Sequence, residues 1–362
     1  MTIYYVTTSG SDSNNGLTEG TAFATPGYAA SQARTLGDVV YVKEGTYNFT
    51  TTSQNVSGGL LSIARGVRFE GYKTTPQDRL ANPVLSFSLL TLSSSVYGVV
   101  LETGGFDSLE PLVVSLTVDG SNNSSLASGF SIGSAYNAGS YYCKAANCYY
   151  GFIGTGNYGG ATACESSNCT FGFYNLRCLS CYASSCVNGF YVYAINGGDK
   201  SFIGCISANN TGMGFYARNQ SHIADSCTAY GNGSNGFFMY YDSQQLTRCL
   251  SVSNSGYGFA LLAGSNAGAE KLWYCADYNN ASGRLKTGNT NYDFNPISLS
   301  SDPFVLASSG DFRLNNNAGG GEDLRHVQTT EIVGFNNCFD IGAIDAVILK
   351  DQNPRTSFHP LV

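Results

Sequence analysis

A short pattern recurs along the middle of this chain and constrains its fold more than any other feature. Each copy has a cysteine, then a Cys or Asn five positions later, then a Gly-Phe pair a few residues on. The copies begin at Cys143, Cys164, Cys181, Cys205, Cys227 and Cys249, with a partial copy at Cys275. The second residue is Cys148, Cys169 and Cys186 in the first three copies and Asn210, Asn232, Asn254 and Asn280 in the rest. The period is roughly 22 residues, which is typical of solenoids and repeat arrays.

A repeat this short cannot bury a core by itself, so each copy must stack on its neighbours along a shared axis. The repeats are rich in Tyr, Phe, Ser, Thr, Asn and Gly, and no helix-length stretch has a 3.6-residue period. Short strands joined by Gly, Asn and Ser turns remain, and they predict an all-β fold, a parallel β-helix. Equivalent residues then recur about 4.8 Å further along the axis and form ladders.

The ladders give specific expectations for which side chains face inward. We expect the Phe ladder from Phe152 to Phe259, and the ladder of first cysteines, to lie in the core. The asparagines at the second position predict a turn ladder, whose side-chain amides hydrogen-bond to the coils above and below.

Composition narrows the partners of this chain. Its 362 residues carry a net charge of −7, and charged residues make up 12%, about half the usual share. No Lys/Arg run is present, which argues against nucleic acid and anionic membranes as partners. A surface of Ser, Thr, Asn, Gly and Tyr hydroxyls fits neutral glycans or another protein better.

The cysteines allow three interpretations: metal ligands, a disulfide framework or packing residues. The spacing within a copy differs from the usual zinc knuckles, and regular replacement of the second Cys by Asn is unlike a metal site. Free Cys is among the most buried residue types and suits a narrow stacked core. Packing is therefore the favoured interpretation, with disulfides between neighbouring coils as the alternative and no metal expected.

Three segments are expected: an N-terminal cap over residues 1–50, coils over 51–295, and a closing segment with a tail over 296–362. In the cap, a helix from about Pro26 to Leu36 should follow Thr25 as N-cap, between strands near Tyr4–Thr7 and Val39–Val42. Such a cap covers the core and strand edge of a terminal coil. No signal peptide precedes Tyr4, and no apolar run reaches transmembrane length.

Both ends of the chain carry a family resemblance. The N-terminal residues concerned are Tyr5-Val6, Ser9 to Gly16, Ala24-Thr25, Gly37 to Val42 and Gly45 to Tyr47. The C-terminal ones are Asp302-Pro303-Phe304, Asp311 to Leu314 and Asp340 to Ala343. These segments resemble the opening and closing segments of right-handed parallel β-helix proteins of the pectate-lyase-like superfamily. The resemblance implies a right-handed parallel β-helix, but the superfamily includes lyases, hydrolases, epimerases, phage tailspikes and non-catalytic virion proteins.

The enzymes of that superfamily need charged groups on coil surfaces. Hydrolases use paired carboxylates, and lyases use calcium-binding acids with a basic proton acceptor. The chain has no adjacent Asp-Asp, no Gly-His-Gly, no Arg-Ile-Lys and no Asp-Pro-His. The hydrolase and epimerase signatures are therefore missing, and no cofactor is expected unless the protein is a calcium-dependent lyase.

Strand alternation places the residues one and three positions after each ladder Phe on the outer surface. The first row contains Tyr174, Tyr191, Tyr216 and Phe238, and the second contains Tyr193, Arg218 and Tyr240. Two adjacent aromatic rows suit stacking on sugar rings or burial by another subunit or loop. Burial by a subunit or loop is the favoured interpretation.

A polar row lies five residues before the first cysteine of each copy. It contains Lys200, His222, Gln244 and Glu270, with Arg218, Asp225 and Asp242 expected nearby. This is the one cluster that could hold an acid/base pair. In a lyase, Arg218 or His222 would be the base, Tyr240 the acid and Lys200 the group that neutralises charge.

Two functional hypotheses follow. The first is a non-catalytic structural β-helix of a virion, a capsid decoration protein or tail-associated adhesin, that assembles as a homotrimer through its aromatic faces. Its partners would be other virion proteins or surface glycans, and its location a virion or the extracellular space. The second is a polysaccharide lyase or hydrolase, or a glycan-binding module, that uses the Tyr/Arg/His face.

Overall fold

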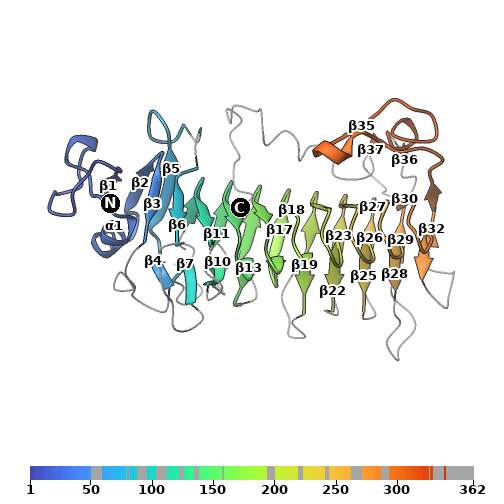
Figure 1. Ribbon diagram of the computed structural model, residues 1–362, viewed down its shortest axis with the longest axis horizontal. Helices are drawn as coiled ribbons and strands as arrows, with labels where there is room; N and C mark the ends of the chain where they lie inside the picture. The colour runs from blue at the N-terminus through green and yellow to red at the C-terminus, as the bar shows by residue number, and fades with distance from the viewer. Residues whose placement is uncertain are drawn as a thin grey trace.

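In the computed structural model the chain winds into a long solenoid with three parallel sheets along its sides (Figure 1). The structure describes residues 1–49, 59–78, 80, 82–87, 96–102, 112–121, 126–133, 138–156, 159–193, 200–218, 223–240, 244–261, 271–286, 293–325, 327–328 and 338–339. Each coil contributes one strand to each sheet in turn, and neighbouring coils pair in parallel. The predicted all-β parallel β-helix is confirmed.

Three sheets, A, B and C, are formed by the strands of successive coils. Sheet A contains β1 (Ile3–Val6), β2 (Val39–Lys43), β5 (Arg68–Tyr72), β8 (Leu112–Val114), β11 (Gly139–Tyr141), β14 (Gly160–Thr162), β17 (Arg177–Leu179), β20 (Phe202–Ile203), β23 (Ile223–Asp225), β26 (Gln245–Thr247), β29 (Lys271–Trp273) and β32 (Asp293–Phe294). Sheet B contains β3 (Thr46–Asn48), β6 (Val84–Ser86), β9 (Thr117–Asp119), β12 (Lys144–Ala146), β15 (Glu165–Ser167), β18 (Tyr182–Ser184), β21 (Ile206–Ala208), β24 (Thr228–Tyr230), β27 (Leu250–Val252), β30 (Ala276–Tyr278) and β33 (Ile297–Ser298). Sheet C contains β4 (Gly59–Ile63), β7 (Val96–Leu101), β10 (Leu126–Ile132), β13 (Tyr150–Gly154), β16 (Phe171–Tyr174), β19 (Asn188–Val192), β22 (Phe215–Ala217), β25 (Phe237–Met239), β28 (Phe259–Leu261) and β31 (Leu285–Lys286).

The cysteine pattern is explained by the corners of the coil. The chain turns from sheet A to sheet B at a single left-handed residue, such as Ser226 with φ of 53°, and the next residue, Cys227, points into the core. A second left-handed residue, such as Asn209 with φ of 54°, ends the sheet B strand and is followed by inward-facing Asn210. The two cysteine or asparagine positions are thus the inward residues that flank the sheet B strand.

The first-cysteine ladder is fully buried and contains Cys143, Cys164, Cys181, Cys205, Cys227, Cys249 and Cys275. All the cysteines whose side chains the structure describes are free thiols. Each ladder thiol lies close to a backbone carbonyl of the preceding coil, as Cys181 Sγ does to Ala161 O at 3.2 Å. Burial disfavours the thiolate and raises the pKa of the Cys143, Cys181, Cys227 and Cys275 thiols.

The phenylalanine ladder fills the core behind sheet C. Its rings are Phe130, Phe152, Phe173, Phe190, Phe215, Phe237 and Phe259, all of them buried. Successive rings are nearly parallel, with centroids 4.7 Å apart for Phe215 and Phe237. Each ladder Phe follows a glycine because the neighbouring coil lies too close for a Cβ: one added at Gly189 would be 2.1 Å from Ser207 Oγ. The inward Phe ladder is confirmed.

The N-terminal cap contains α1 (Pro26–Gln32), whose first turn is capped by Thr25 Oγ1 accepting from Tyr28 N at 3.2 Å. The helix is shorter than predicted, because Ala33 already leaves helical geometry. Ala29 and Ala33 are buried, while Tyr28 and Leu36 are exposed. The preceding loop, which includes the 3-10 helix η1 (Glu19–Thr21), covers the edge of β1 through Phe23 N to Tyr5 O at 2.9 Å.

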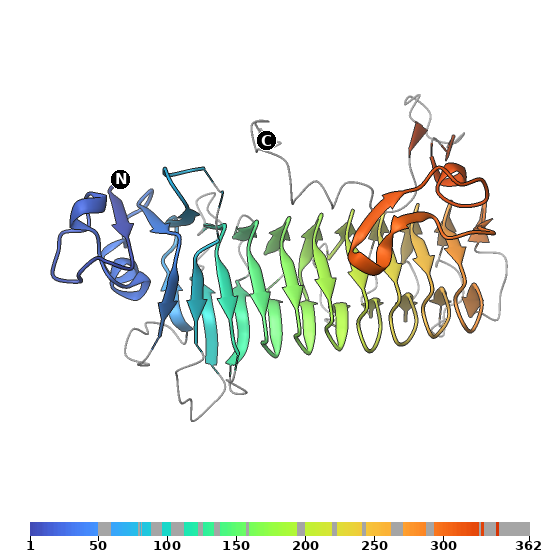
Figure 2. The same cartoon turned by 45° about the horizontal axis from the view of Figure 1, so that its top comes forward.

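After the last coil, the chain folds back along the solenoid, as Figure 2 shows. Residues 299–325 form a C-terminal unit with the antiparallel strands β34 (Phe304–Leu306) and β35 (Asp311–Leu314) and the 3-10 helices η4 (Ala307–Ser309) and η5 (Glu322–Leu324). This unit packs on the outer face of sheet B. A further antiparallel pair joins β36 (Val327–Gln328) to β37 (Cys338–Phe339). No described helix is long and apolar enough to cross a membrane.

Candidate functional site

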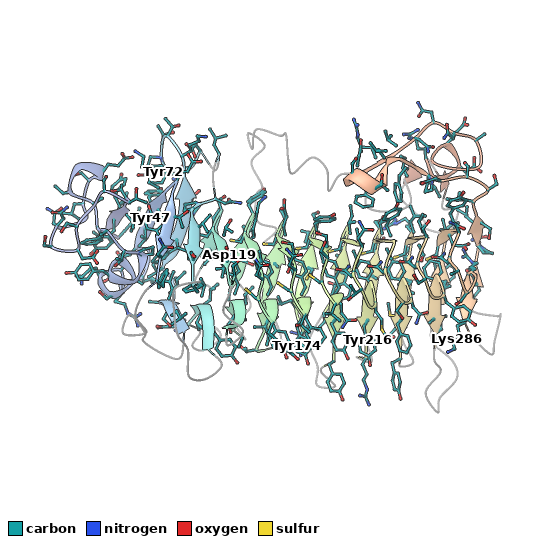
Figure 3. All side chains as sticks on the ribbon, in the orientation of Figure 1. Tyr47, Tyr72, Asp119, Tyr174, Tyr216 and Lys286 are labelled. Atoms are coloured by element: carbon teal, nitrogen blue, oxygen red, sulfur yellow. The ribbon has the colours of Figure 1, made fainter. Side chains whose placement is uncertain are left out.

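The outer face of sheet C carries the first predicted aromatic row. Tyr174, Tyr191, Tyr216 and Phe238 occupy equivalent positions of β16, β19, β22 and β25 and pair in register. Tyr174 and Tyr216 project from the side of the solenoid opposite the C-terminal unit (Figure 3). The outward orientation predicted from strand alternation is therefore confirmed for this row.

The rings of this row stack on one another along the solenoid axis. The centroids of Tyr191 and Tyr216 are 4.2 Å apart with planes 12° from parallel. Tyr174 stacks on Tyr191 at 5.6 Å and 7°, and Phe238 covers the other side of Tyr216 at 5.4 Å and 16°. Sandwiched in this way, Tyr216 is only 8% exposed. The row therefore turns ring edges and hydroxyls to the outside, whereas the ring faces are covered by neighbouring rings.

The second row is more exposed and holds a cation. Arg218 lies between two rings, with its guanidinium carbon 4.8 Å from the centroid of Tyr193 and 5.0 Å from that of Tyr240. Its Nη1 also donates to Tyr193 Oη at 2.7 Å. Tyr193 is 42% exposed and Tyr240 37%. The guanidinium is thus held by cation–π contacts on both sides.

Burial changes the acidity of three tyrosines of the first row. Burial raises the pKa of Tyr191 to about 12, and it also raises the pKa of Tyr174 and Tyr216. These three tyrosines are therefore neutral at physiological pH. Further along, the row continues to Ala260 and Lys286.

The aromatic face extends further toward the N-terminus than the sequence predicted. Tyr150 and Phe171 pair across β13 and β16, with centroids 5.4 Å apart, and Tyr149 projects beside them. Tyr150 precedes the ladder residue Phe152 by two positions. The same strand alternation, applied before each ladder Phe as well as after it, would have found this row.

The polar row does not form the exposed cluster that the sequence predicted. Lys200 is 1% exposed and its Nζ donates to Gly156 O, while Gln244 is equally buried and donates from Nε2 to Ala217 O at 3.2 Å. Both side chains fill the interior, so Lys200 does not lie where it could neutralise charge on a substrate at the surface. His222, Glu270 and Asp242 lie outside the described residues.

Asp225 is also separated from Arg218. It lies on β23 in sheet A, where its carboxylate accepts from Arg248 Nε at 3.0 Å and pairs with the Nη2 of the same guanidinium. Arg218 follows β22 in sheet C. The predicted acid/base cluster is therefore divided between two sides of the solenoid, because sheets A and C face in different directions.

Two charged networks were not anticipated from the sequence, and both are internally satisfied. Arg284 bonds Asp277 and Asp293, each at 2.8 Å, and its guanidinium lies 5.4 Å from the ring centroid of Phe259, the last ring of the Phe ladder. Near the N-terminus, Glu19 accepts from Lys43 Nζ and Tyr72 Oη, both at 2.8 Å. Across the described part of the chain, no group of three or more His, Cys, Asp or Glu side chains could hold a metal ion.

Comparison with known proteins supports the fold alone. No family model and no curated protein matches the sequence. Among solved structures, pectate lyase Pel9A matches with a TM-score of 0.50 and 16% identity, over 95% of this chain and 96% of that chain. The A-module of Azotobacter vinelandii mannuronan C-5 epimerase AlgE4 gives 0.47 and 13%, over 80% and 79% of the two chains. Geobacillus virus E2 ORF18 gives 0.44 and 15%, over 75% and 56%.

The Pel9A match extends over nearly the whole of both chains. The chain has the pectate-lyase-like parallel β-helix fold. The resemblance seen at the two ends of the sequence is thereby confirmed for the fold. At 16% identity, the pectate-lyase-like fold does not bring the activity of any of these proteins to this chain.

Proposed function

We propose that this pectate-lyase-like β-helix is a non-catalytic structural protein of a virion, a capsid decoration protein or tail-associated adhesin. It assembles as a homotrimer through the aromatic face of sheet C. The observation that carries the proposal is the face-to-face stacking of Tyr174, Tyr191, Tyr216 and Phe238, which leaves the ring edges on the outside. The proposal needs no metal or cofactor.

A row of rings that exposes edges and covers faces favours a protein partner over a sugar. Sugar rings bind aromatic residues by lying on the ring face, and here Tyr191 and Tyr216 cover each other's faces at 4.2 Å. The exposed surface of the row consists of C–H edges and hydroxyls, which another protein surface can cover by close packing and hydrogen bonds. Tyrosine and arginine are also the residue types enriched in such interfaces, and acidic residues are depleted there.

The arrangement of charged groups supports a role without catalysis. Among the described residues, Lys200 is buried, Asp225 is paired with Arg248 on another sheet, and Arg218 is held between two rings. General acid–base chemistry needs a donor and an acceptor within reach of one substrate atom. Besides its aromatic rings, the described outer face of sheet C offers two cations, Arg218 and Lys286.

The shape and surface of the molecule support the proposed virion setting. A solenoid with one continuous core is an elongated, rigid body (Figure 1). With 12% charged residues, it suits dense side-by-side packing with other virion proteins or contact with surface glycans. Both partners belong to the proposal, as does the location on a virion or outside the cell.

A polysaccharide lyase or glycan-binding module is the second candidate, and one contact favours it. Arg218 and Tyr240, the base and acid of the lyase hypothesis, lie side by side, with the guanidinium carbon 5.0 Å from the ring centroid. Against this candidate, the guanidinium also bonds Tyr193 Oη at 2.7 Å and covers ring faces that a sugar would need.

The decisive experiment compares two variants by light scattering. Tyr193→Ser combined with Tyr240→Ser removes the two most exposed rings of the predicted rows and should convert the trimer to monomers, with far-UV circular dichroism unchanged. Leu179→Ser is the matched control, because Leu179 is similarly exposed but lies on sheet A. It should leave the trimer intact.

The same proteins are then incubated with uronate and neutral polysaccharides. A wild-type protein that cleaves no glycan and binds none through the face of sheet C, together with loss of the trimer in the double variant, supports the structural role. Binding or cleavage of one glycan that the double variant abolishes would establish the second candidate in its place.

A further inference from the structure

At the N-terminal end of the solenoid, the first strand of each sheet has one edge with no strand of a preceding coil beside it. In sheet A the loop before α1 covers this edge, where Thr7 N donates to Phe23 O at 3.0 Å. In sheet C the first strand is β4, and α1 packs against it. Sheet B begins with β3 at the same end (Figure 1), and its edge differs from the other two.

Strand β3 hydrogen-bonds to β6 through every second residue. Phe49 N donates to Ser86 O at 2.9 Å, on the side of β3 that faces β6. The backbone groups of alternate residues in a strand point to opposite edges, so Tyr47 also faces β6, whereas Thr46 and Asn48 face the free edge. On that side, no hydrogen bond joins the backbone of Thr46 or Asn48 to another residue that the structure describes. The edge of β3 thus keeps unused N–H and C=O groups.

A pocket with a volume of about 130 Å³ lies along this free edge. Residues 46–49 of β3 and the segment that follows it line one side, and Thr8 with residues 24–26 lines the other. Thr8 approaches the beginning of β3, since a Cβ at Gly45 would be 2.6 Å from Thr8 Cγ2. Tyr47, at the N-terminal end of the solenoid in Figure 3, belongs to the β3 side. The unused backbone groups and the pocket therefore occur at the same place.

The size and lining of the pocket suit one uncharged side chain. Pockets that hold a whole small molecule usually measure about 300–1,000 Å³, so a volume of about 130 Å³ holds only part of a ligand. The lining residues are Thr, Ala, Pro, Tyr, Asn and Phe, and none of them is charged. The Tyr47 hydroxyl is already used, because it donates to Lys43 O at 2.8 Å. A charged group in this pocket would lose water without gaining an ionic partner.

The N-terminal cap restricts what can reach the edge of β3. Strand β1 and helix α1 extend past β3 along the solenoid axis (Figure 1). A second solenoid placed end to end would therefore meet the cap before its strands could pair with β3. An extended segment is only one strand wide, so it can lie between the cap and β3, where a preceding coil would otherwise lie.

We propose that the free edge of β3 binds an extended, uncharged segment of another protein as an additional strand of sheet B. The N–H and C=O groups of Thr46 and Asn48 form main-chain hydrogen bonds with the segment, and the pocket accepts one of its side chains. Recognition by strand addition combines these two elements, because backbone bonds give affinity and side-chain pockets give specificity. The proposal does not rest on the aromatic face of sheet C or on trimer formation.

Hydrogen exchange of the wild-type protein, measured by NMR, tests whether the edge is free. The amides of Thr46 and Asn48 should exchange roughly a hundredfold faster than those of Tyr47 and Phe49, which are bonded to β6. Equal protection of all four amides in a dilute sample would show that this chain already fills the edge, and it would overturn the proposal. Protection that appears only as the protein concentration rises would assign the edge to a second copy and would also overturn it.

Blocked pentapeptides are the probes for binding. Their sequence is acetyl-Val-Thr-X-Thr-Val-amide, with Ala, Val or Leu at X. At millimolar concentration, at least one of them should slow the exchange of the Thr46 and Asn48 amides roughly tenfold. A fourth peptide with Lys at X should bind roughly tenfold more weakly, because the pocket offers no opposite charge. Equal binding of the Lys peptide, or protection by none of the four, would contradict the proposal.

Asn48→Pro removes one N–H from the free edge without removing a bond to β6. This variant should lose the protection of Thr46 by the peptide. Asn48→Ala is the matched control, because it removes the side chain and keeps the N–H, and it should bind the peptide as the wild type does. Far-UV circular dichroism should be unchanged in both. Loss of binding in Asn48→Ala would assign recognition to the side chain and would argue against strand addition. The measurements on the wild-type protein do not depend on how well either variant folds.

Discussion

The side chain of Asn232 donates a hydrogen bond from Nδ2 to Asn254 Oδ1, 2.8 Å away in the next coil. The same oxygen accepts the backbone N–H of Asn232 at 2.9 Å, and Asn232 Nδ2 also reaches back to Ser207 O at 3.1 Å. The bonds repeat from Asn210 to Asn232 and from Asn254 to Asn280. Each buried amide therefore ties together three coils, as the sequence predicted for this ladder.

Replacing Asn232 with Ala should destabilise the protein by about 2 kcal/mol, because buried polar groups lose their partners. Asn232→Cys is the matched comparison, because Cys148, Cys169 and Cys186 occupy the equivalent position in earlier coils. It should cost less than Asn232→Ala. Urea denaturation followed by the fluorescence of Trp273, the single tryptophan, measures both. Equal stability of wild type and Asn232→Ala would argue against the ladder.

Truncation of the Phe ladder should cost more than truncation of the outer aromatic row. Phe215→Ala leaves a cavity between two stacked rings in the core, and we expect a loss of about 3–5 kcal/mol. Phe238→Ala removes a ring of the same type from the outer face and should cost roughly half as much or less. The comparison uses the same denaturation assay, and a larger cost for Phe238→Ala would reverse the assignment of inside and outside.

A methyl group should be tolerated at one strand glycine and not at another. At Gly189 a Cβ would be 2.1 Å from Ser207 Oγ and 2.8 Å from Gly214 O, so Gly189→Ala must push two coils apart. At Gly160 the nearest atom would be Arg177 O at 3.4 Å. We expect soluble expression and a normal unfolding midpoint for Gly160→Ala, and a lowered midpoint or insoluble protein for Gly189→Ala. Similar behaviour of the two variants would contradict the close approach of neighbouring coils.

Between about pH 8 and 10, one buried lysine should make the wild-type protein gain stability relative to a variant that lacks it. Burial lowers the pKa of Lys200 from 10.5 to about 8, so the unfolded chain holds this proton over a range in which the folded protein has lost it. The urea midpoint of the wild type minus that of Lys200→Met should therefore increase across that range. Buried thiols such as Cys227, whose pKa folding raises, should make both proteins less stable over the same range. Above about pH 10 both proteins should lose further stability, because folding raises the pKa of Tyr150 and Tyr191 to about 12.

The fold was predictable because the residue types of its repeat are compatible with few other structures. Inward cysteines and asparagines mark both corners of sheet B, and the Gly-Phe pair marks the closest approach of sheet C strands. The ends were less predictable. Helix α1 ends at Gln32, although the apolar pattern runs on to Leu36, because the chain must turn there to begin β2.

The site was predictable only in its local part. Strand alternation places Tyr191 and Tyr216 on the outer face of sheet C correctly, since alternation depends on adjacent residues alone. It could not place Lys200, because that residue lies at a corner between sheets, where the alternation stops and the side chain turns inward. The sequence also did not predict that the C-terminal unit packs on sheet B, because this packing depends on a return of the chain that no local pattern encodes.

The most direct test of the account is the molar mass of the wild-type protein in solution, measured by light scattering over a range of concentrations. Uronate and neutral polysaccharides are then added to the same sample. The account predicts a stable trimer that cleaves none of them and binds none through Tyr193, Arg218 and Tyr240. A monomer at every concentration, or a protein that cleaves or binds one glycan through Tyr193, Arg218 and Tyr240, would contradict the claim that the sheet C face is an assembly surface.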